Sequence, residues 1–215
     1  MSSRFKGNFF VVNHTQMYKV FFNQKPIFLT TEFVNQTESS PVLFVKFSSA
    51  ENILKAIKSK KIESLYLYHQ DEDKLWMHFL RCFPVVEAAG GLVRHEDERI
   101  LFIFRNKKWD LPKGRIEKNE AIKTAAIREV EEETGAEDLE IIKPLIQTFH
   151  IFTRHGKYKL KKTYWFEMKT ASTKKLTPQA NEGIEEAVWV SESEVPSKFK
   201  NAYENIKQVY AEFKN

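Results

Sequence analysis

The chain has 215 residues and a mass of 25.3 kDa, enough for one or two domains. Its 42% hydrophobic and 29% charged residues exclude collagen-like, low-complexity and largely disordered chains. Apolar runs such as Ile100–Phe104 are far shorter than the ~18 residues of a membrane span, and no secretory signal is recognisable. With a single cysteine, Cys82, which fits a small core residue, these features predict a cytoplasmic protein without a membrane partner. The net charge of +5 suits anionic ligands.

Residues 1–83 predict a small α+β domain, and nothing in their pattern indicates a role for it. Residues 1–16 precede the patterned sequence, so we expect a loosely held extension there. The apolar segments Tyr18–Phe22 and Pro26–Thr30 predict a hairpin. The other elements expected here are a strand at Val42–Phe47, a helix beginning at Ser48–Glu51, a strand at Ile62–Tyr68 and a helix at Asp71–Cys82.

Pro84 marks the expected boundary of a second domain, residues 84–215. The pattern predicts strands at Ile100–Phe104, Glu140–Phe152, Lys162–Met168 and Val188–Val190, a loop at Arg105–Gly114, and helices at Glu120–Thr134 and Ala202–Phe213. Strands and helices alternate without strict regularity. We therefore expect an α/β fold with a mixed sheet and helices on both of its faces.

The helix after Gly114 concentrates acidic residues on one face. Glu129, Glu132 and Glu133 have the i, i+3, i+4 spacing of neighbours on a helix, while Val130 belongs to the apolar stripe that should dock on the sheet. Crowded carboxylates repel one another, and burial raises the cost of each charge. A divalent cation reverses that cost, and hard oxygen ligands favour Mg²⁺, Mn²⁺ or Ca²⁺. The alternative is a solvated, Glu-rich helix surface.

The residues around this cluster support the first interpretation. Gly135 stands where a left-handed cap would end the helix, and Gly114 could turn sharply and offer its carbonyl oxygen. Arg128 could pair with Glu120 or Glu117 and hold the loop against the helix.

The full spacing is Gly114, five residues, Glu120, seven residues, Arg128-Glu129-Val130, one residue, Glu132-Glu133, one residue, Gly135. It resembles the signature of the Nudix hydrolases. Ala88-Ala89-Gly90-Gly91 and the approach Trp109-Asp110-Leu111-Pro112-Lys113 are also similar to family members. The departure is Ala136, where a larger aliphatic residue is usual, and this is a packing position. The resemblance covers residues 84–215 and implies a Nudix-type α/β/α sandwich with a mixed sheet, preceded by the small α+β domain.

The resemblance also implies roles for residues of the signature. Glu129, Glu132 and Glu133 would bind Mg²⁺, or Mn²⁺ in its place, together with the Gly114 carbonyl. Glu120 could join through water. Arg128 would fix the carboxylates and not touch substrate.

A general base is also needed, and it could be a glutamate of the signature, such as Glu132, or one on a late loop. We favour Glu182 of the late loop. The alternatives are Glu185, Glu186, His150 and His155.

Three cationic and three aromatic residues are further candidates for substrate binding. Arg105 and Lys113 flank the loop that enters the helix and could grip a polyphosphate from both sides, with Lys162 adding positive charge. Trp109 is a candidate platform for stacking a base, as are Tyr164 and Trp165, although core or rim packing is the favoured interpretation for each of them.

The expected reaction is hydrolysis of a pyrophosphate bond in a nucleoside or dinucleoside polyphosphate, by attack of water on phosphorus. The alternatives are an ADP-ribose or nucleotide-sugar pyrophosphatase, a hydrolase of diphosphoinositol compounds, and a catalytically silent Nudix module that binds a nucleotide. No nucleic-acid signature is visible, so a small nucleotide is the expected partner and nucleic acid is not. The first domain could pack against the second or form a homodimer interface.

Overall fold

The computed structural model describes residues 17–215 of the chain, so the extension expected at 1–16 lies outside the described residues. The strands are β1 (Met17–Phe22), β2 (Lys25–Thr30), β3 (Val42–Phe44), β4 (Leu65–Tyr68), β5 (Val85–His95), β6 (Ile100–Arg105), β7 (Lys108–Asp110), β8 (Lys113–Arg115), β9 (Glu140–Arg154), β10 (Lys157–Thr170) and β11 (Ile184–Val190). The α-helices are α1 (Ala50–Lys58), α2 (Glu72–Cys82), α3 (Ile122–Thr134), α4 (Val195–Phe199) and α5 (Glu204–Phe213), and the 3₁₀ helices are η1 (Val45–Phe47), η2 (Ala180–Glu182) and η3 (Glu192–Glu194). None of the described helices is both long and apolar enough to cross a bilayer.

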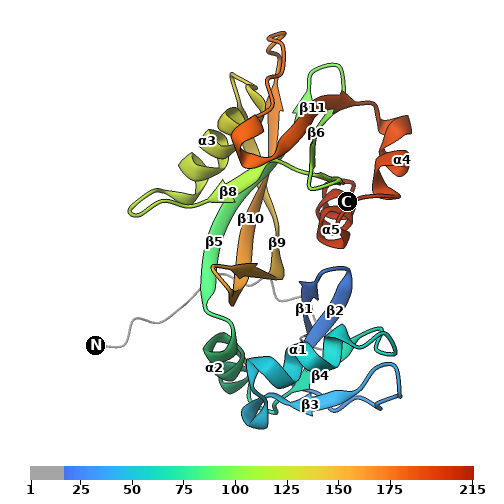
Figure 1. Cartoon of the computed structure of the whole chain (residues 1–215). Coiled ribbons are helices and arrows are strands. Elements are labelled where there is room, and N and C mark those ends of the chain that lie inside the picture. The colour runs from blue at the N-terminus through green and yellow to red at the C-terminus, as the bar shows by residue number, and fades with distance from the viewer. Residues whose placement is uncertain (1–16) are drawn as a thin grey trace.

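One mixed sheet runs through the molecule in the order β11-β6-β5-β10-β9-β1-β2-β4-β3 (Figure 1). Strand β10 lies in its middle, parallel to β5 and antiparallel to β9. Strands β7 and β8 extend the sheet as side pairs of β6 and β5. The expectation of an α/β fold with a mixed sheet is confirmed.

Helices cover both faces of the sheet at residues 84–215, which makes the predicted α/β/α sandwich. On one face, Ala126 and Val130 of α3 pack against Ala89, Val93 and Met168. On the other face, helices α4 and α5 cover a separate core. Its members include Phe102, Trp165, Val195, Ile206 and Val209. Strand β11 is the edge strand beside β6, and the 13-residue helix α3 packs against β5.

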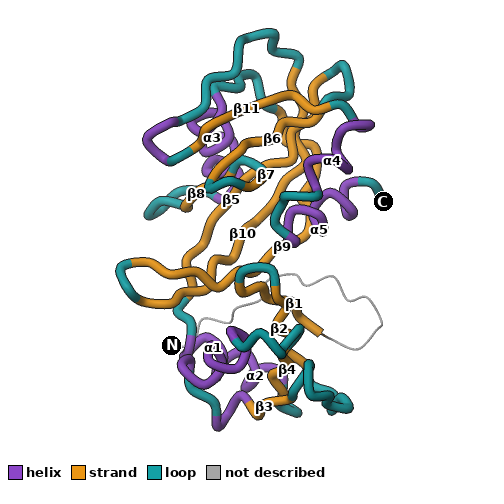
Figure 2. Tube along the Cα trace, turned by 45° about the vertical axis from the view of Figure 1, so that its right-hand side comes forward, coloured by secondary structure: helices purple, strands orange, loops and turns teal. Residues whose placement is uncertain are grey.

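Residues 17–83 add an α+β module to the end of this sheet, as Figures 1 and 2 show. Strand β1 pairs with β9 in parallel, with Phe21 opposite His150, and forms the predicted hairpin with β2. Helices α1 and α2 begin at side-chain caps, because Ser49 and Asp71 each accept a hydrogen bond from a backbone N–H of the first turn. The two helices share one apolar core with the strands. That core includes Ile151 of β9, so the module and the rest of the molecule are packed together through the shared sheet.

Several expectations differ from the structure in detail. The strand expected at Val42–Phe47 ends at Phe44, because a 3₁₀ turn at Val45–Phe47 leads into α1. The loop expected at Arg105–Gly114 contains the short strands β7 and β8, whose backbones pair with β6 and β5. Helix α4 has no counterpart among the expected elements. Cys82 is half-buried at the end of α2, where burial raises the pKa of its thiol, in keeping with a packing role.

Candidate active site

Helix α3 presents its acidic residues to two different environments. The side chains of Glu129 and Glu133 are both buried, Glu133 completely, although each carries a carboxylate. The side chain of Glu132 is 49% exposed. Burial of charge without a partner is expensive, so the partners of these groups indicate what the helix face is for.

Arg128 binds the carboxylates on the outer side of α3. Its guanidinium donates hydrogen bonds to both oxygens of Glu120, at 2.7 and 2.9 Å, and to Glu129 and Glu132 at 2.8 and 2.9 Å. It also reaches the carbonyl oxygen of Arg115 at 3.2 Å. The side-chain hydrogen bond to Arg128 lowers the pKa of Glu120. Arg128 therefore ties the loop before α3 to the helix, as its pairing with Glu120 was expected to do.

Glu133 points the other way, toward the strands. Its carboxylate accepts hydrogen bonds from Nη1 of Arg105 at 3.0 Å and from the backbone N–H of Lys113 at 2.8 Å. Burial nevertheless raises the pKa of Glu133 to about 7, although Lys113 and Arg105 act in the opposite direction. Burial also raises the pKa of Glu129. Two carboxyl groups of this helix are thus held where a nearby positive charge would stabilise their ionised forms.

Two glycines bracket this arrangement. A side-chain Cβ at Gly114 would lie 1.8 Å from Oε2 of Glu129, so only glycine lets the carboxylate approach the loop backbone so closely. Gly135 has a φ of 70° and caps α3 in the left-handed conformation, which confirms the expected cap.

These groups suit a hard divalent cation by their chemistry, since they are carboxylate oxygens beside a glycine that leaves room for no side chain. In the described residues, however, no three His, Cys, Asp or Glu side chains are grouped as they would be around a metal ion. Arg128 bridges Glu129 and Glu132, while Glu133 is held on the far side by Arg105. A cation bound by Glu129 and Glu132 would therefore have to share these carboxylates with Arg128 or displace the Arg128 guanidinium from them. The ligand roles of Glu129, Glu132, Glu133 and Gly114 stay predictions.

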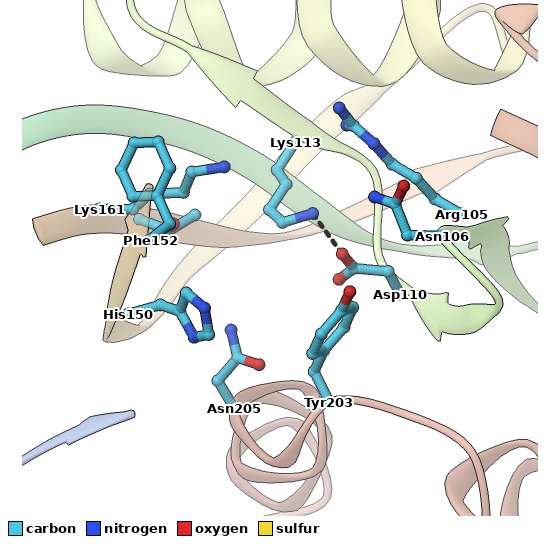
Figure 3. Close-up of a pocket in the computed structure, with 10 residues that line it drawn as sticks. Arg105, Asn106, Asp110, Lys113, His150, Phe152, Lys161, Tyr203 and Asn205 are labelled. Atoms are coloured by element: carbon cyan, nitrogen blue, oxygen red, sulfur yellow. Dashed lines mark hydrogen bonds and ion pairs between the residues drawn. The ribbon is translucent and has the colours of Figure 1, made fainter. Parts of the chain in front are cut away.

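A cavity of about 200 Å³ lies next to Glu133, between the sheet and α5 (Figure 3). Arg105 and Lys113, which both contact Glu133, line one side of it, so the cavity and the acidic helix are adjacent. The rest of its wall is formed by Asn106, Asp110, His150, Phe152, Lys161, Thr163, Tyr203 and Asn205. Three cationic side chains against one carboxylate make the cavity a site for an anion.

Burial shifts the pKa values of titratable side chains that line this cavity. Nζ of Lys113 lies 2.6 Å from Asp110 in a buried ion pair. Burial lowers the pKa of Lys161 to about 8, and it lowers the pKa of His150 to about 4. At neutral pH, Lys161 is therefore mostly charged and His150 is neutral. An anionic group entering the cavity would stabilise the charged form of Lys161.

The structure separates Lys162 and the aromatic candidates from the cavity. Lys162 leaves β10 on the face opposite to Lys161, and its Nζ lies 4.6 Å from the centre of the Tyr164 ring. Trp165 is fully buried and donates a hydrogen bond to Thr148, so it is a core residue. Trp109 packs against Phe104, with the amine of Lys198 3.7 Å from its ring centre. None of these side chains lines the cavity, and substrate roles for Lys162 and Trp109 stay predictions without geometric support.

Among the candidate bases, Glu182 lies nearest to the site. It belongs to η2, and its carboxylate is 3.5 Å from Nη2 of Arg105. Glu185 and Glu186 are exposed on β11. His155 is exposed at the turn between β9 and β10, whereas His150 lines the cavity. Arg105 therefore connects Glu182 with Glu133 and the cavity.

A family model for the NUDIX domain matches residues 84–213. The chain belongs to the NUDIX family. The match begins at the boundary expected from Pro84 and includes α3, the cavity and both helices of the opposite face. These residues form a NUDIX domain, and the family generally uses divalent metal ions.

Similar proteins come from distant sources. The chain is 27% identical over 130 residues to the mRNA-decapping protein g5R of African swine fever virus, covering 52% of this chain and 53% of that protein. It is 32% identical over 98 residues to the RNA pyrophosphohydrolase of Pelagibacter ubique, covering 40% of this chain and 62% of that protein. The chain thus matches a little over half the length of these relatives. A solved Ap4A hydrolase from C. elegans is 19% identical, with a TM-score of 0.47, and the match covers 60% of this chain and 95% of that one.

Sequence reasoning missed most of the cavity wall of this Nudix domain. Lys161, Asp110, Tyr203 and Asn205 were not among its expected site residues, although Lys161 is next to Lys162 in the same basic run. Strand alternation alone would have shown that the two lysines point to opposite faces. It would not have shown which face carries the cavity.

Proposed function

We propose that this chain hydrolyses a pyrophosphate bond in a nucleoside or dinucleoside polyphosphate, with Mg²⁺ as the metal ion. The observation that carries the proposal is the adjacency of the α3 carboxylates to a cationic cavity, through Arg105 and Lys113. Phosphate groups in the cavity would place the bond to be broken next to the acidic helix. The names of the two curated relatives, which refer to decapping and to RNA pyrophosphohydrolysis, support a substrate of this chemical kind.

In this proposal Glu129, Glu132, Glu133 and the carbonyl oxygen of Gly114 hold Mg²⁺, with Mn²⁺ as a possible substitute. An ion held by these residues would supply positive charge next to the phosphates and would lower the pKa of a nearby water molecule. Arg128 keeps Glu129 and Glu132 in place and contacts no substrate atom. It is a positioning residue, because its guanidinium is already occupied by carboxylates and by a backbone carbonyl.

The cationic side chains bind the phosphates that do not react. Arg105 and Lys113 stand on the side of the cavity that faces α3, and Lys161 stands on β10. Charge-assisted hydrogen bonds from such groups to phosphate oxygens are about twice as strong as neutral ones. Three of them would fix a short polyphosphate against the sheet.

Glu182 is the proposed general base, with Glu132 as the alternative within the signature. The carboxylate takes a proton from the attacking water, the new bond forms between water oxygen and phosphorus, and the bond from phosphorus to the bridging oxygen breaks. The leaving phosphate departs with the electron pair of that bond. The 3.5 Å distance from Arg105 to Glu182 supports this choice, because one guanidinium then orients both Glu133 and the base.

A substrate panel tests the proposal. Phosphate release is measured with Mg²⁺ from nucleoside triphosphates, dinucleoside polyphosphates, ADP-ribose and a diphosphoinositol compound, for the wild type, Glu133→Gln and Glu131→Gln. Glu131 belongs to the same helix but is exposed, so its variant is the matched control. We expect the highest turnover with a nucleoside or dinucleoside polyphosphate, and its loss in Glu133→Gln only.

The panel also addresses the other candidate functions. Preference for ADP-ribose would replace the proposed substrate by the nucleotide-sugar class. A chain that binds nucleotide without cleaving any compound would be a catalytically silent module, and turnover unchanged by Glu133→Gln would defeat the assignment of α3. A cytoplasmic location and assembly as a homodimer stay predictions.

A further inference from the structure

The module of residues 17–83 buries one face of its sheet and leaves the other without a helical cover. Helices α1 and α2 share a core with Val20, Leu29 and Leu67. Side chains alternate along a strand, so Phe28 and Tyr66 leave the sheet on the opposite face. Within residues 17–215, the aromatic side chains gathered on that opposite side belong to none of the three buried clusters. We call them the aromatic face: Phe28, Phe33, Phe44, Tyr66 and Tyr68.

These rings form a connected surface. Phe28 and Tyr66 are stacked, with centroids 5.0 Å apart and planes 24° from parallel. Phe33 and Phe44 both meet the ring of Tyr68 edge to face, at 5.8 and 5.6 Å. Phe33 is 65% exposed and Phe44 is 50% exposed. Exposed apolar patches often mark binding sites, which makes this surface a candidate for ligand binding.

The aromatic face lies on the same side of the sheet as the cavity of the NUDIX domain. In the β1–β9 pair, Phe21 lies opposite His150, which lines the cavity, and both leave the sheet on the same face. Lys19 lies on the same face of β1, and its amine is 5.0 Å from the centre of the Phe21 ring and 5.8 Å from the centre of the Phe28 ring. Neighbouring strands are about 4.8 Å apart, so the three steps from β9 to β4 span about 15 Å. The aromatic face therefore lies about 15 Å from the cavity on the same side of the sheet, with the buried Phe21 between them.

We propose that the aromatic face binds the bases of a single-stranded RNA whose 5′ polyphosphate enters the cavity. The cavity of about 200 Å³ is smaller than the ~300 Å³ at the lower end of drug-sized ligand sites, so it holds phosphates and leaves the rest of a substrate outside. Stacking of a base on an aromatic side chain strengthens binding and tolerates any base. Lys19, between the cavity and the rings, supplies a positive charge for a connecting phosphate.

This inference rests on the proposed function for the placement of the phosphates, and it departs from the expectation that nucleic acid is not a partner. It gives residues 17–83 a role as a substrate-binding module. A nucleoside triphosphate would use only the cavity, whereas a longer RNA would use both parts. The difference between the affinities of these two ligands therefore measures the contribution of the aromatic face.

The test is a binding measurement on the full chain without metal, so that no cleavage occurs. The probes are ATP and a 5′-triphosphorylated RNA of about 12 nucleotides, within the range of single-strand site sizes. The double variant Phe44→Ala/Tyr68→Ala is compared with Phe47→Ala. Phe47 is 78% exposed but belongs to the 3₁₀ turn that packs against α2, so it is a matched control. Melting temperatures confirm that each variant is folded.

We expect the wild type and Phe47→Ala to bind the RNA at least ~10-fold more tightly than ATP, and the double variant to lose that preference. The inference is wrong if a folded double variant keeps the preference, or if Phe47→Ala loses it equally. It is also wrong if the wild type shows no preference and light scattering finds a dimer that the double variant breaks, because the face then binds a second copy. Because binding is measured without turnover, failure here is distinct from failure of the substrate panel.

Discussion

Helices α1 and α3 show two ways of using a helix in one chain. Helix α1 begins at Ser49, whose hydroxyl accepts a hydrogen bond from the N–H of Asn52, and it buries Ile53, Leu54 and Ile57. Helix α3 begins at Ala121 without a side-chain cap and has no acidic residue in its first turn. It buries two carboxylates together with small apolar side chains.

The difference separates residues that stabilise the fold from residues that serve the site. Every buried side chain of α1 contributes apolar area, so changes there should act on stability. The buried Glu129 and Glu133 cost free energy, which is recovered only in part from Arg128, Arg105 and the Lys113 backbone. Departures from good local design are expected at functional sites. Substitutions in the two regions should therefore affect different properties of the protein.

The largest effect is expected at Glu129. In Glu129→Gln, kcat/KM for the best substrate of the panel should fall about 10³-fold, equivalent to ~4 kcal/mol, because one carboxylate ligand of the cation is lost. The melting temperature should not fall, since burial already raises the pKa of this carboxyl and the amide removes a buried charge. Steady-state kinetics and thermal unfolding measure the two quantities. Activity within a few-fold of wild type would remove Glu129 from the metal site.

The opposite result is expected in the apolar core of the module. Leu67 is fully buried on β4, and Leu67→Ala should lower the free energy of unfolding by about 2–5 kcal/mol through lost burial and a cavity. The kcat for a nucleoside triphosphate should not change where the variant is folded. Met77→Ala, on the exposed side of α2, is the control, and it should have little effect on the free energy of unfolding or on kcat. A fall in kcat parallel to the loss of stability would show that the module and the catalytic region do not act separately.

A smaller effect is expected at Lys161, and it should depend on pH. At pH 7, Lys161→Met should raise KM about 10-fold, because one charge-assisted hydrogen bond to phosphate is lost. The pKa of Lys161 is about 8, so the wild-type amine loses its charge above that pH. The difference in KM between the wild type and Lys161→Met should therefore become smaller by pH 9. Lys162→Met, a change at the next residue on the opposite face of β10, should leave KM unchanged at both pH values.

Stability gives an independent check on the same residue. The folded pKa of Lys161 lies below its ordinary value of 10.5, so between about pH 8 and 10.5 the unfolded chain binds more protons than the folded one. The contribution of Lys161 to stability therefore rises with pH through that range. Lys161→Met should be more stable than wild type at pH 7, by on the order of 2 kcal/mol, and lose this advantage toward pH 10. An advantage independent of pH would contradict the burial of a charged amine.

The signature made α3 predictable because its information is local. A periodic stripe, a glycine cap and the spacing of the glutamates all lie within one helix, and the structure confirms the helix and the cap at Gly135. The hairpin of β1 and β2 was predictable for the same reason. The short strand β8 owes its conformation to backbone pairing with β5, which is distant in sequence, and no local pattern encodes that pairing.

The cavity could not be predicted because it depends on which faces of distant strands meet α5. His150 and Lys161 come from β9 and β10, and Asn205 comes from the C-terminal helix. The parallel pairing of β1 with β9, which brings the module beside the cavity, is equally non-local. The sequence could indicate which groups are candidates for holding a metal, but not on which side of the sheet the phosphates would lie.

The smallest effect is expected at the start of α3, where a cap is missing. Ala121 has the extended backbone of an N-cap residue, with φ −72° and ψ 141°, so Ala121→Ser can accept a hydrogen bond from an N–H of the first turn without strain. It should raise the free energy of unfolding by about 1 kcal/mol, the amount that Ser49→Ala should remove from α1. Chemical denaturation measures both changes. If Ala121→Ser gains nothing while Ser49→Ala loses stability, the first turn of α3 is already satisfied by other groups, and the contrast between the two helices lies in their buried carboxylates alone.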